Sequence, residues 1–265
     1  MTFLTSIAIS SLFYLSVFVF LAGFIYRVSL YYSTPQPLKI PQTPQPVNVG
    51  GVVFRMAGDV LFFRSLSKGT TLLFFAGWIF HITLLVTGIR HLRYFLPMVP
   101  DVVVWFSHVA IFIGFVLLLS LVVLLIRRIV DKKVVFVSSL SDYFVLLLLI
   151  CIVFTGLLMR YAPFRPDIVG IKGLMLELVN PVTAFSLLTL HPPHAPANYM
   201  FAIHIILVFI LLIYFPFSKL MHMGGYFFSP TRYMVNNPRT KRYVNPWDKE
   251  PGNLTVSGEG GQNNG

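Results

Sequence analysis

Five long apolar stretches govern what this chain of 265 residues can fold into. A helix needs about 20 residues to cross the roughly 30 Å hydrocarbon core of a bilayer, and each stretch meets or approaches that length. Backbone polar groups inside a bilayer must be satisfied within helices or closed barrels, so the sequence predicts an all-α integral membrane bundle of five transmembrane helices. The stretches, each followed directly by Arg or Lys, are Ile7 to Tyr26, Gly69 to Ile89, Val102 to Ile126, Tyr143 to Met159 and Tyr199 to Ser218.

The basic residues predict how the bundle is oriented. With five crossings, fifteen of the 20 Lys and Arg residues fall on the side that holds the C-terminus, and five fall on the other. Cytoplasmic loops carry the excess of positive charge in membrane proteins. We therefore expect a multi-pass protein of the cytoplasmic membrane with its N-terminus outside and its C-terminus in the cytoplasm.

Composition excludes several classes of function. Only 11% of the residues are charged, against about 25% in soluble domains. The net charge of +11 comes from residues at the ends of apolar runs, so it predicts membrane orientation and no nucleic-acid partner. The single cysteine, Cys151, leaves no Cys pair for a covalent haem and no Cys set for an iron–sulfur cluster. Any iron–sulfur chemistry must belong to another subunit.

The remaining segments predict the domain organisation. Residues 1–223 form the transmembrane domain, and the polar residues 224–265 form a cytoplasmic tail that either docks a partner or is disordered. Five prolines between Ser33 and Val49 predict an extended linker. The stretches from Gly51 to Lys68 and from Asp167 to Leu190 mix apolar and charged residues, which predicts helices lying along the two membrane surfaces.

Four histidines stand at matched depths on the second and fifth helices. His81 lies inside the second helix and His91 just past its outer end, while His204 lies near the outer end of the fifth helix and His222 just past its inner end. Because these helices run in opposite directions, His91 faces His204 near the outside and His81 faces His222 near the cytoplasm. Two facing imidazole pairs are suited to two bis-histidine haems that transfer electrons and leave no coordination position open.

The spacing of the four histidines is unequal. The ten-residue step on the second helix spans about 15 Å and the eighteen-residue step on the fifth about 27 Å, a difference that tilt and side-chain direction must absorb. Two interpretations without haem stay open: a proton relay in a transporter or channel, and a structural anchor whose histidines bond between helices. A zinc site is disfavoured, because the histidines are split between two depths without a carboxylate among them.

Further residues fit either haem or ordinary packing. Arg90 and Arg93 flank His91 and either pair with haem propionates or mark the membrane interface. Several helix glycines either admit a porphyrin or let helices pack closely. These glycines are Gly77, Gly88, Gly114 and Gly156.

The apolar body, roughly residues 5 to 235, resembles the gamma subunit of respiratory nitrate reductase. The resemblance rests on Phe80-His81 with His91 nine residues on, on the F-P-F-S-K-L-M-H run from Phe215 to His222, and on the run from Ser141 to Ile150. It implies two non-covalent b haems held by four histidines of the second and fifth helices, with quinol oxidised near the outer haem. Carried over, His91 and His204 hold the outer iron, and His81 and His222 the inner one.

The tail, from Ser229 to Trp247, looks more like DsrM, the cytochrome b subunit of the sulfite-reductase-associated DsrMKJOP complex, with the heterodisulfide reductase membrane subunit a further cousin. This resemblance implies menaquinol as substrate and a cytoplasmic iron–sulfur partner resembling the catalytic subunit of heterodisulfide reductase. It also implies further membrane subunits and extracytoplasmic cytochrome c or iron–sulfur subunits, and a role in sulfate respiration. A nitrate reductase-like complex is the alternative.

One departure from the nitrate reductase pattern concerns the quinone. Those relatives place a lysine near the start of the third helix, whereas this chain has none between Asp101 and His108. Either His108, Arg90 or Arg93 serves instead, or the quinone site is built differently; His108 is the best substitute, with a hydrogen bond between helices as the alternative. His191 and His194, in the outer loop, either carry protons released by quinol or have no special role.

Overall fold

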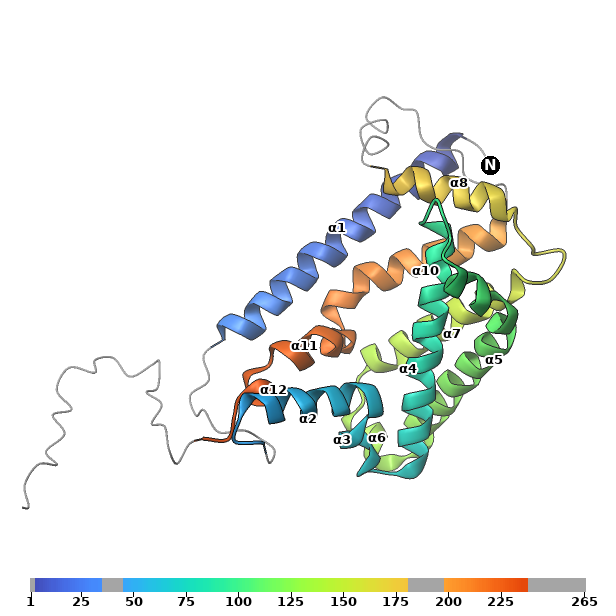
Figure 1. Cartoon of the computed structure of the whole chain (residues 1–265). Helices are drawn as coiled ribbons and strands as arrows, with labels where there is room; N and C mark the ends of the chain where they lie inside the picture. The colour runs from blue at the N-terminus through green and yellow to red at the C-terminus, as the bar shows by residue number, and fades with distance from the viewer. Residues whose placement is uncertain (1–2, 35–44, 181–197, 238–265) are drawn as a thin grey trace, which may run out of the picture.

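The computed structural model describes the chain except for residues 1–2, 35–44, 181–197 and 238–265. All regular structure in the described part is helical (Figure 1), which confirms the all-α prediction. Among the residues that the structure describes, five helices are long and apolar enough to cross a membrane, namely Ser6–Ser33, Thr71–Tyr94, Asp101–Val130, Leu140–Leu158 and Tyr199–Phe217. The elements are α1 (Phe3–Ser33), α2 (Val49–Phe62), α3 (Arg64–Ser67), α4 (Thr71–His91), η1 (Leu92–Tyr94), α5 (Asp101–Val130), α6 (Lys132–Val137), α7 (Leu140–Leu158), α8 (Ile168–Val179), α10 (Tyr199–Tyr214), η3 (Phe215–Phe217), η4 (Lys219–Met221), α11 (His222–Phe228) and α12 (Pro230–Tyr233).

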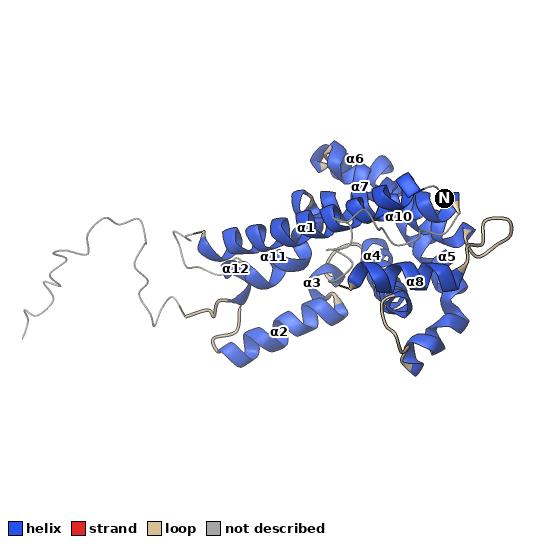
Figure 2. Ribbon diagram, turned by 90° about the horizontal axis from the view of Figure 1, so that it is seen from above, coloured by secondary structure: helices blue, strands red, loops and turns tan. Residues whose placement is uncertain are grey.

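The spanning helices pack as a series of neighbours. Helix α4 packs along α5, α5 along α7, α7 along α10, and α10 along α1 (Figures 1 and 2). The two helices that carry the predicted ligands, α4 and α10, are both fully described and are not packed closely against each other. Helix α4 is positioned by α5, and α10 by α1 and α7. The side of α4 that faces α10 is therefore not in close helix–helix contact.

A core in the middle of the bundle holds α5 against α7. Leu117 and Leu121 of α5 and Leu149 of α7 are buried together, and Phe80 of α4 and Leu211 of α10 pack against them. Side chains of four helices therefore meet in one cluster. Since lipid is as apolar as leucine, close packing rather than burial from water holds such a cluster together.

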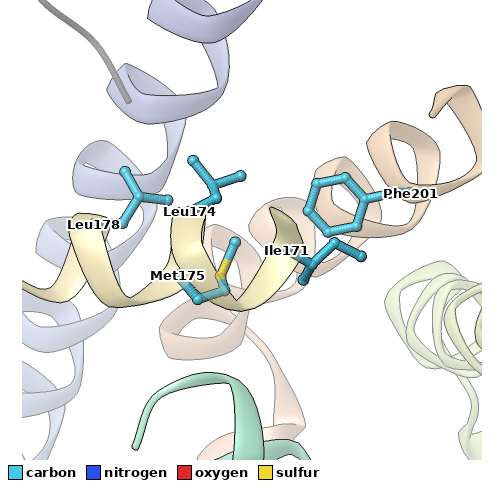
Figure 3. Close-up of a cluster of buried hydrophobic side chains, with 5 residues drawn as sticks. All are labelled: Ile171, Leu174, Met175, Leu178 and Phe201. Atoms are coloured by element: carbon cyan, nitrogen blue, oxygen red, sulfur yellow. The ribbon is translucent and has the colours of Figure 1, made fainter. Parts of the chain in front are cut away.

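A second core lies under α8, at the end of the bundle where α10 begins (Figure 3). Ile171, Leu174, Met175 and Leu178 of α8 are buried together with Phe201 of α10. Helix α8 runs across the end of the bundle (Figure 1). It confirms a helix within the predicted outer segment, and it fixes the first turn of α10.

Helices α2, α11 and α12 lie together on the side of the bundle away from α8 (Figure 1). Asp59 of α2 accepts hydrogen bonds from Arg55 Nη1 (3.0 Å) and from the hydroxyl of Tyr226 on α11 (2.9 Å). Burial and then the bond to Asp59 raise the pKa of the Tyr226 phenol, whose hydroxyl is the donor in this bond. The predicted helix of residues 51–68 is confirmed, with a break at Phe63, whose φ is 50°. Helix α11 runs across residue 223, the predicted domain boundary.

Candidate functional site

The structure brings His81 and His222 together, as the topology of the sequence predicts. Their ring centroids lie 6.0 Å apart and the rings are nearly perpendicular, at 86°. An imidazole nitrogen lies about 2 Å from a metal that it binds, so two rings that bind one metal from opposite sides have centroids about 6 Å apart. The observed separation matches that arrangement.

A break in the fifth helix accounts for the unequal spacing of the histidines. Helix α10 ends at Tyr214, ten residues after His204, which is about 15 Å of helix and equals the step from His81 to His91. Pro216 then removes a backbone donor and cannot continue the helix. The chain passes through two 3-10 turns with Ser218 extended between them. The expected tilt is therefore unnecessary, because the chain turns before it reaches His222.

The outer pair is held by α4 and α10. His91 is the last residue of α4 and His204 is the sixth residue of α10, and the two rings are near neighbours. His204 also lies against α7, where a Cβ added to Gly156 would stand 3.3 Å from His204 Cε1. The small residue on α7 therefore gives the His204 ring its space.

Hydrogen bonds to the backbone set the tautomer of three of these histidines. The Nδ1 atoms lie 2.7 Å from Gly77 O for His81, 2.6 Å from Thr87 O for His91 and 2.8 Å from Lys219 O for His222. A carbonyl oxygen only accepts, so each Nδ1 carries the proton. The Nε2 atom then keeps the lone pair that a metal requires.

Thr155 sets the tautomer of the fourth histidine. Its hydroxyl donates to Cys151 O (2.8 Å) and lies 3.0 Å from Ile152 O. The hydroxyl has one proton, which these carbonyls take, so its oxygen accepts from His204 Nδ1 at 2.9 Å. His204 consequently presents Nε2 as a ligand atom, like the other three histidines.

Positive charge is gathered beside the outer pair. Arg90 Nε is buried and finds no partner among the described residues. Its charge also interacts with those of Arg93 and Arg160, and the Arg93 guanidinium lies 5.6 Å from the Tyr94 ring centroid. Like charges gathered in a protein call for an anion, and haem carries two propionate carboxylates. The residues present therefore fit a haem at this place.

The comparisons with known proteins agree with this geometry. Residues 40–244 match the family model described as the nitrate reductase gamma subunit. The chain belongs to that family. It is also 36% identical over 280 aligned positions to the Hdr-like menaquinol oxidoreductase cytochrome b-like subunit of Archaeoglobus fulgidus, covering 89% of this chain and 81% of the relative. The corresponding subunit of Archaeoglobus profundus is 33% identical over 284 positions, covering 90% and 82%.

Membership of the gamma-subunit family, together with the five apolar helices, makes this a multi-pass membrane protein of the cytochrome b electron-transfer type. Within the described residues, His, Cys, Asp and Glu side chains form no group of three or more suited to a metal ion. The histidines come in pairs, and a pair of histidines would be able to hold the iron of a b-type haem.

Other predicted residues are not brought to the histidine pairs. His108 is exposed, and its Nδ1 bonds to Trp105 O (3.1 Å) on its own helix. His191 and His194 lie outside the described residues. Of the four glycines singled out in the sequence, Gly77 and Gly114 face leucine side chains, which favours helix packing, Gly156 faces His204, and Gly88 has open space beside it.

Sequence reasoning missed Thr155 and the residues that hold the segment before His222. Thr155 is one of three threonines in the helices that carry a bond back to the preceding turn, with Thr83 and Thr87. Nothing in the sequence distinguishes it from the other two. Its role depends on α10 packing against α7, which is a tertiary contact.

Proposed function

We propose that this chain binds two b-type haems, the outer one through His91 and His204 and the inner one through His81 and His222. The observation that carries the proposal is the common state of the four rings: each donates from Nδ1 and keeps its Nε2 lone pair. A proton relay is disfavoured by the same bonds. A ring whose Nδ1 proton is held by a backbone carbonyl has no titratable neighbour there to pass it to.

A bound haem would supply one-electron redox chemistry at its iron. The chain itself supplies ligands, charge and shape. Arg90 and Arg93 would compensate the propionates of the outer haem, and the open side of Gly88, one turn before His91, leaves room for a porphyrin edge. His91 and His204 of the outer pair are half-buried, whereas His222 of the inner pair is exposed, and exposure to solvent is one of the means by which a protein tunes a redox potential.

We further propose that the subunit transfers electrons from menaquinol, oxidised near the outer side, to a cytoplasmic iron–sulfur subunit in a sulfur- or sulfite-linked respiratory complex. The Archaeoglobus relatives, which are Hdr-like menaquinol oxidoreductase subunits, support menaquinol as the substrate and an Hdr-like assembly. The excess of basic residues on the C-terminal side supports a cytoplasmic docking face there. His108, Arg90 and Arg93 remain the candidates for contact with the quinone.

The second candidate is the gamma subunit of a nitrate reductase-like complex, which the family match favours. It shares the haems and the quinol site with the first candidate and differs in the partner. Copurification of the partner from native membranes separates the two, because only one of them brings a subunit resembling the heterodisulfide reductase catalytic chain.

A pyridine haemochrome assay on the purified chain tests the haem proposal. We expect two b haems per chain, falling to one in His91→Ala, because loss of one axial ligand releases the outer haem alone. His108→Ala is the matched control, since this exposed ring lies outside both pairs. The proposal is wrong if the wild-type chain holds no haem or if His91→Ala keeps both.

A further inference from the structure

His222 differs from the other three candidate ligands in how it is held. His81, His91 and His204 belong to long helices, whose backbone hydrogen bonds fix the main chain that carries each ring. His222 follows two 3-10 turns and opens the short helix α11. Its Nδ1 bonds to Lys219 O (2.8 Å), so the direction of the ring depends on where Lys219 lies.

Lys219 is in turn held by a buried carboxylate. Its Nζ lies 2.7 Å from Oδ2 of Asp142, on the first turn of α7. The Asp142 side chain is only 4% exposed, although that of Lys219 is 68% exposed. This ion pair joins the segment before His222 to a helix 77 residues earlier in the sequence.

The same carboxylate gathers donors from two further places. Arg128 Nη1, near the end of α5, lies 3.0 Å from Asp142 Oδ2. The backbone N–H of Ser139 donates at 3.0 Å and its hydroxyl at 3.2 Å. Arg128 is fixed in its turn, because Nη1 also donates to Ser138 Oγ (2.9 Å) and its carbonyl accepts from the Tyr143 hydroxyl (3.1 Å). Asp142 is thus a rigid point at which α5, α7 and the segment 218–222 meet.

We propose that Asp142 is the positioning residue of the inner site and that it sets the orientation of the His222 ring through Lys219. This inference rests on the proposed role of His222 as an axial ligand. Residues outside the first coordination shell orient metal-binding histidines and typically change metal affinity about 10-fold to 100-fold when they are removed. Here that role falls to Asp142, which acts through two contacts: its ion pair with Lys219 and the hydrogen bond from His222 to Lys219 O. No regular helix precedes His222 to fix it directly.

The simpler explanation is that Asp142 only caps α7 and ties it to α5. Asp131 shows what that role requires: it caps α6 through Lys133 N (3.0 Å) and pairs with Arg127 (3.7 Å), the neighbour of Arg128. Its bonds in the described structure do not reach the segment 218–222. The pair with Lys219 is therefore what distinguishes Asp142, and Asp131→Asn is a matched control.

The test uses the full chain with both haems bound. The redox titration and the low-spin EPR signal of each haem are measured, and the inner component is identified as the one missing from His81→Ala. Asp142→Asn removes the carboxylate charge. Lys219→Met breaks only the ion pair between Asp142 and the segment that carries His222, and leaves the α7 cap and the contact with Arg128 in place. Lys219→Arg can still reach the carboxylate.

We expect Asp142→Asn and Lys219→Met to change the EPR signal and potential of the inner haem, and to speed its transfer to excess apomyoglobin by about tenfold or more. In these variants the outer haem keeps its wild-type signal, and in Asp131→Asn both haems do. Lys219→Arg should give an inner-haem signal between those of Lys219→Met and the wild type. The inference is overturned if Lys219→Met matches Asp131→Asn, or if both haems change equally. A wild-type chain without haem would instead refute the proposed function itself.

Discussion

The hydrogen bond from His204 to Thr155 allows a prediction whose size follows from the structure. Thr155→Val keeps the shape of the side chain and removes the oxygen that accepts from His204 Nδ1 at 2.9 Å. A buried donor left without a partner costs about 1–3 kcal/mol, and the Ile152 carbonyl, which also bonds to His204, makes this an upper bound. A tenfold change in an equilibrium constant corresponds to about 1.4 kcal/mol, so the affinity for the outer haem should fall by up to about 100-fold, within the range usual for such residues.

The assay measures the rate at which each haem is transferred to excess apomyoglobin. The outer haem is identified by the optical component that is missing from His91→Ala. The control is Thr83→Val. Thr83 is also buried and also donates to the preceding turn, at 2.7 Å from Ile79 O, but its hydroxyl touches no histidine. If Thr155→Val and Thr83→Val release the outer haem at the same rate, the proposed tautomer control by Thr155 is wrong.

Two substitutions of glycine test the packing around the ligands. Gly156→Ala places a Cβ 3.3 Å from His204 Cε1; since Thr155 holds that ring, we expect a partial loss of outer haem by haemochrome assay. Gly173→Ala, with no atom within 4 Å of the new Cβ, is the control and should leave the count at the wild-type value. Gly23→Ala places a Cβ 2.6 Å from Pro216 Cβ, which cannot rotate away, so α1 or the helix break must move. We expect a lower thermal unfolding temperature and a disturbed inner-haem EPR signal; unchanged values for both would show that this contact is not needed.

The five spanning helices were predictable because each is a long apolar run closed by a basic residue. Their ends were less so: α1 continues past Arg27 to Ser33, because a charged residue stops the hydrophobic run without stopping the helix. The pairing of the inner histidines followed from topology alone, since antiparallel helices bring opposite ends together. The orientation of the bundle, the haems and the quinone contacts remain predictions.

The way in which His222 reaches His81 was not predictable, although its cause stands in the sequence. Pro216 is visible there, but the helix was expected to continue and to tilt. A proline indicates where a helix stops, and the direction taken afterwards depends on tertiary contacts. Those contacts are the Lys219–Asp142 pair and the packing of Pro216 on Gly23, and they join residues far apart in the chain.

The two candidate haem sites therefore differ in what holds them. The outer histidines stand on α4 and α10, and the buried core beneath α8 fixes the first turn of α10. The inner site depends on α11, which begins with His222 and is bound one turn later, through Tyr226, to Asp59 of α2. One short helix thus carries an inner ligand and also forms part of the surface on the side of the C-terminus. A partner that docked against α2 or α11 would contact the helix that carries His222, whereas His91 of the outer pair lies ten residues beyond His81 on α4, about 15 Å further along the bundle.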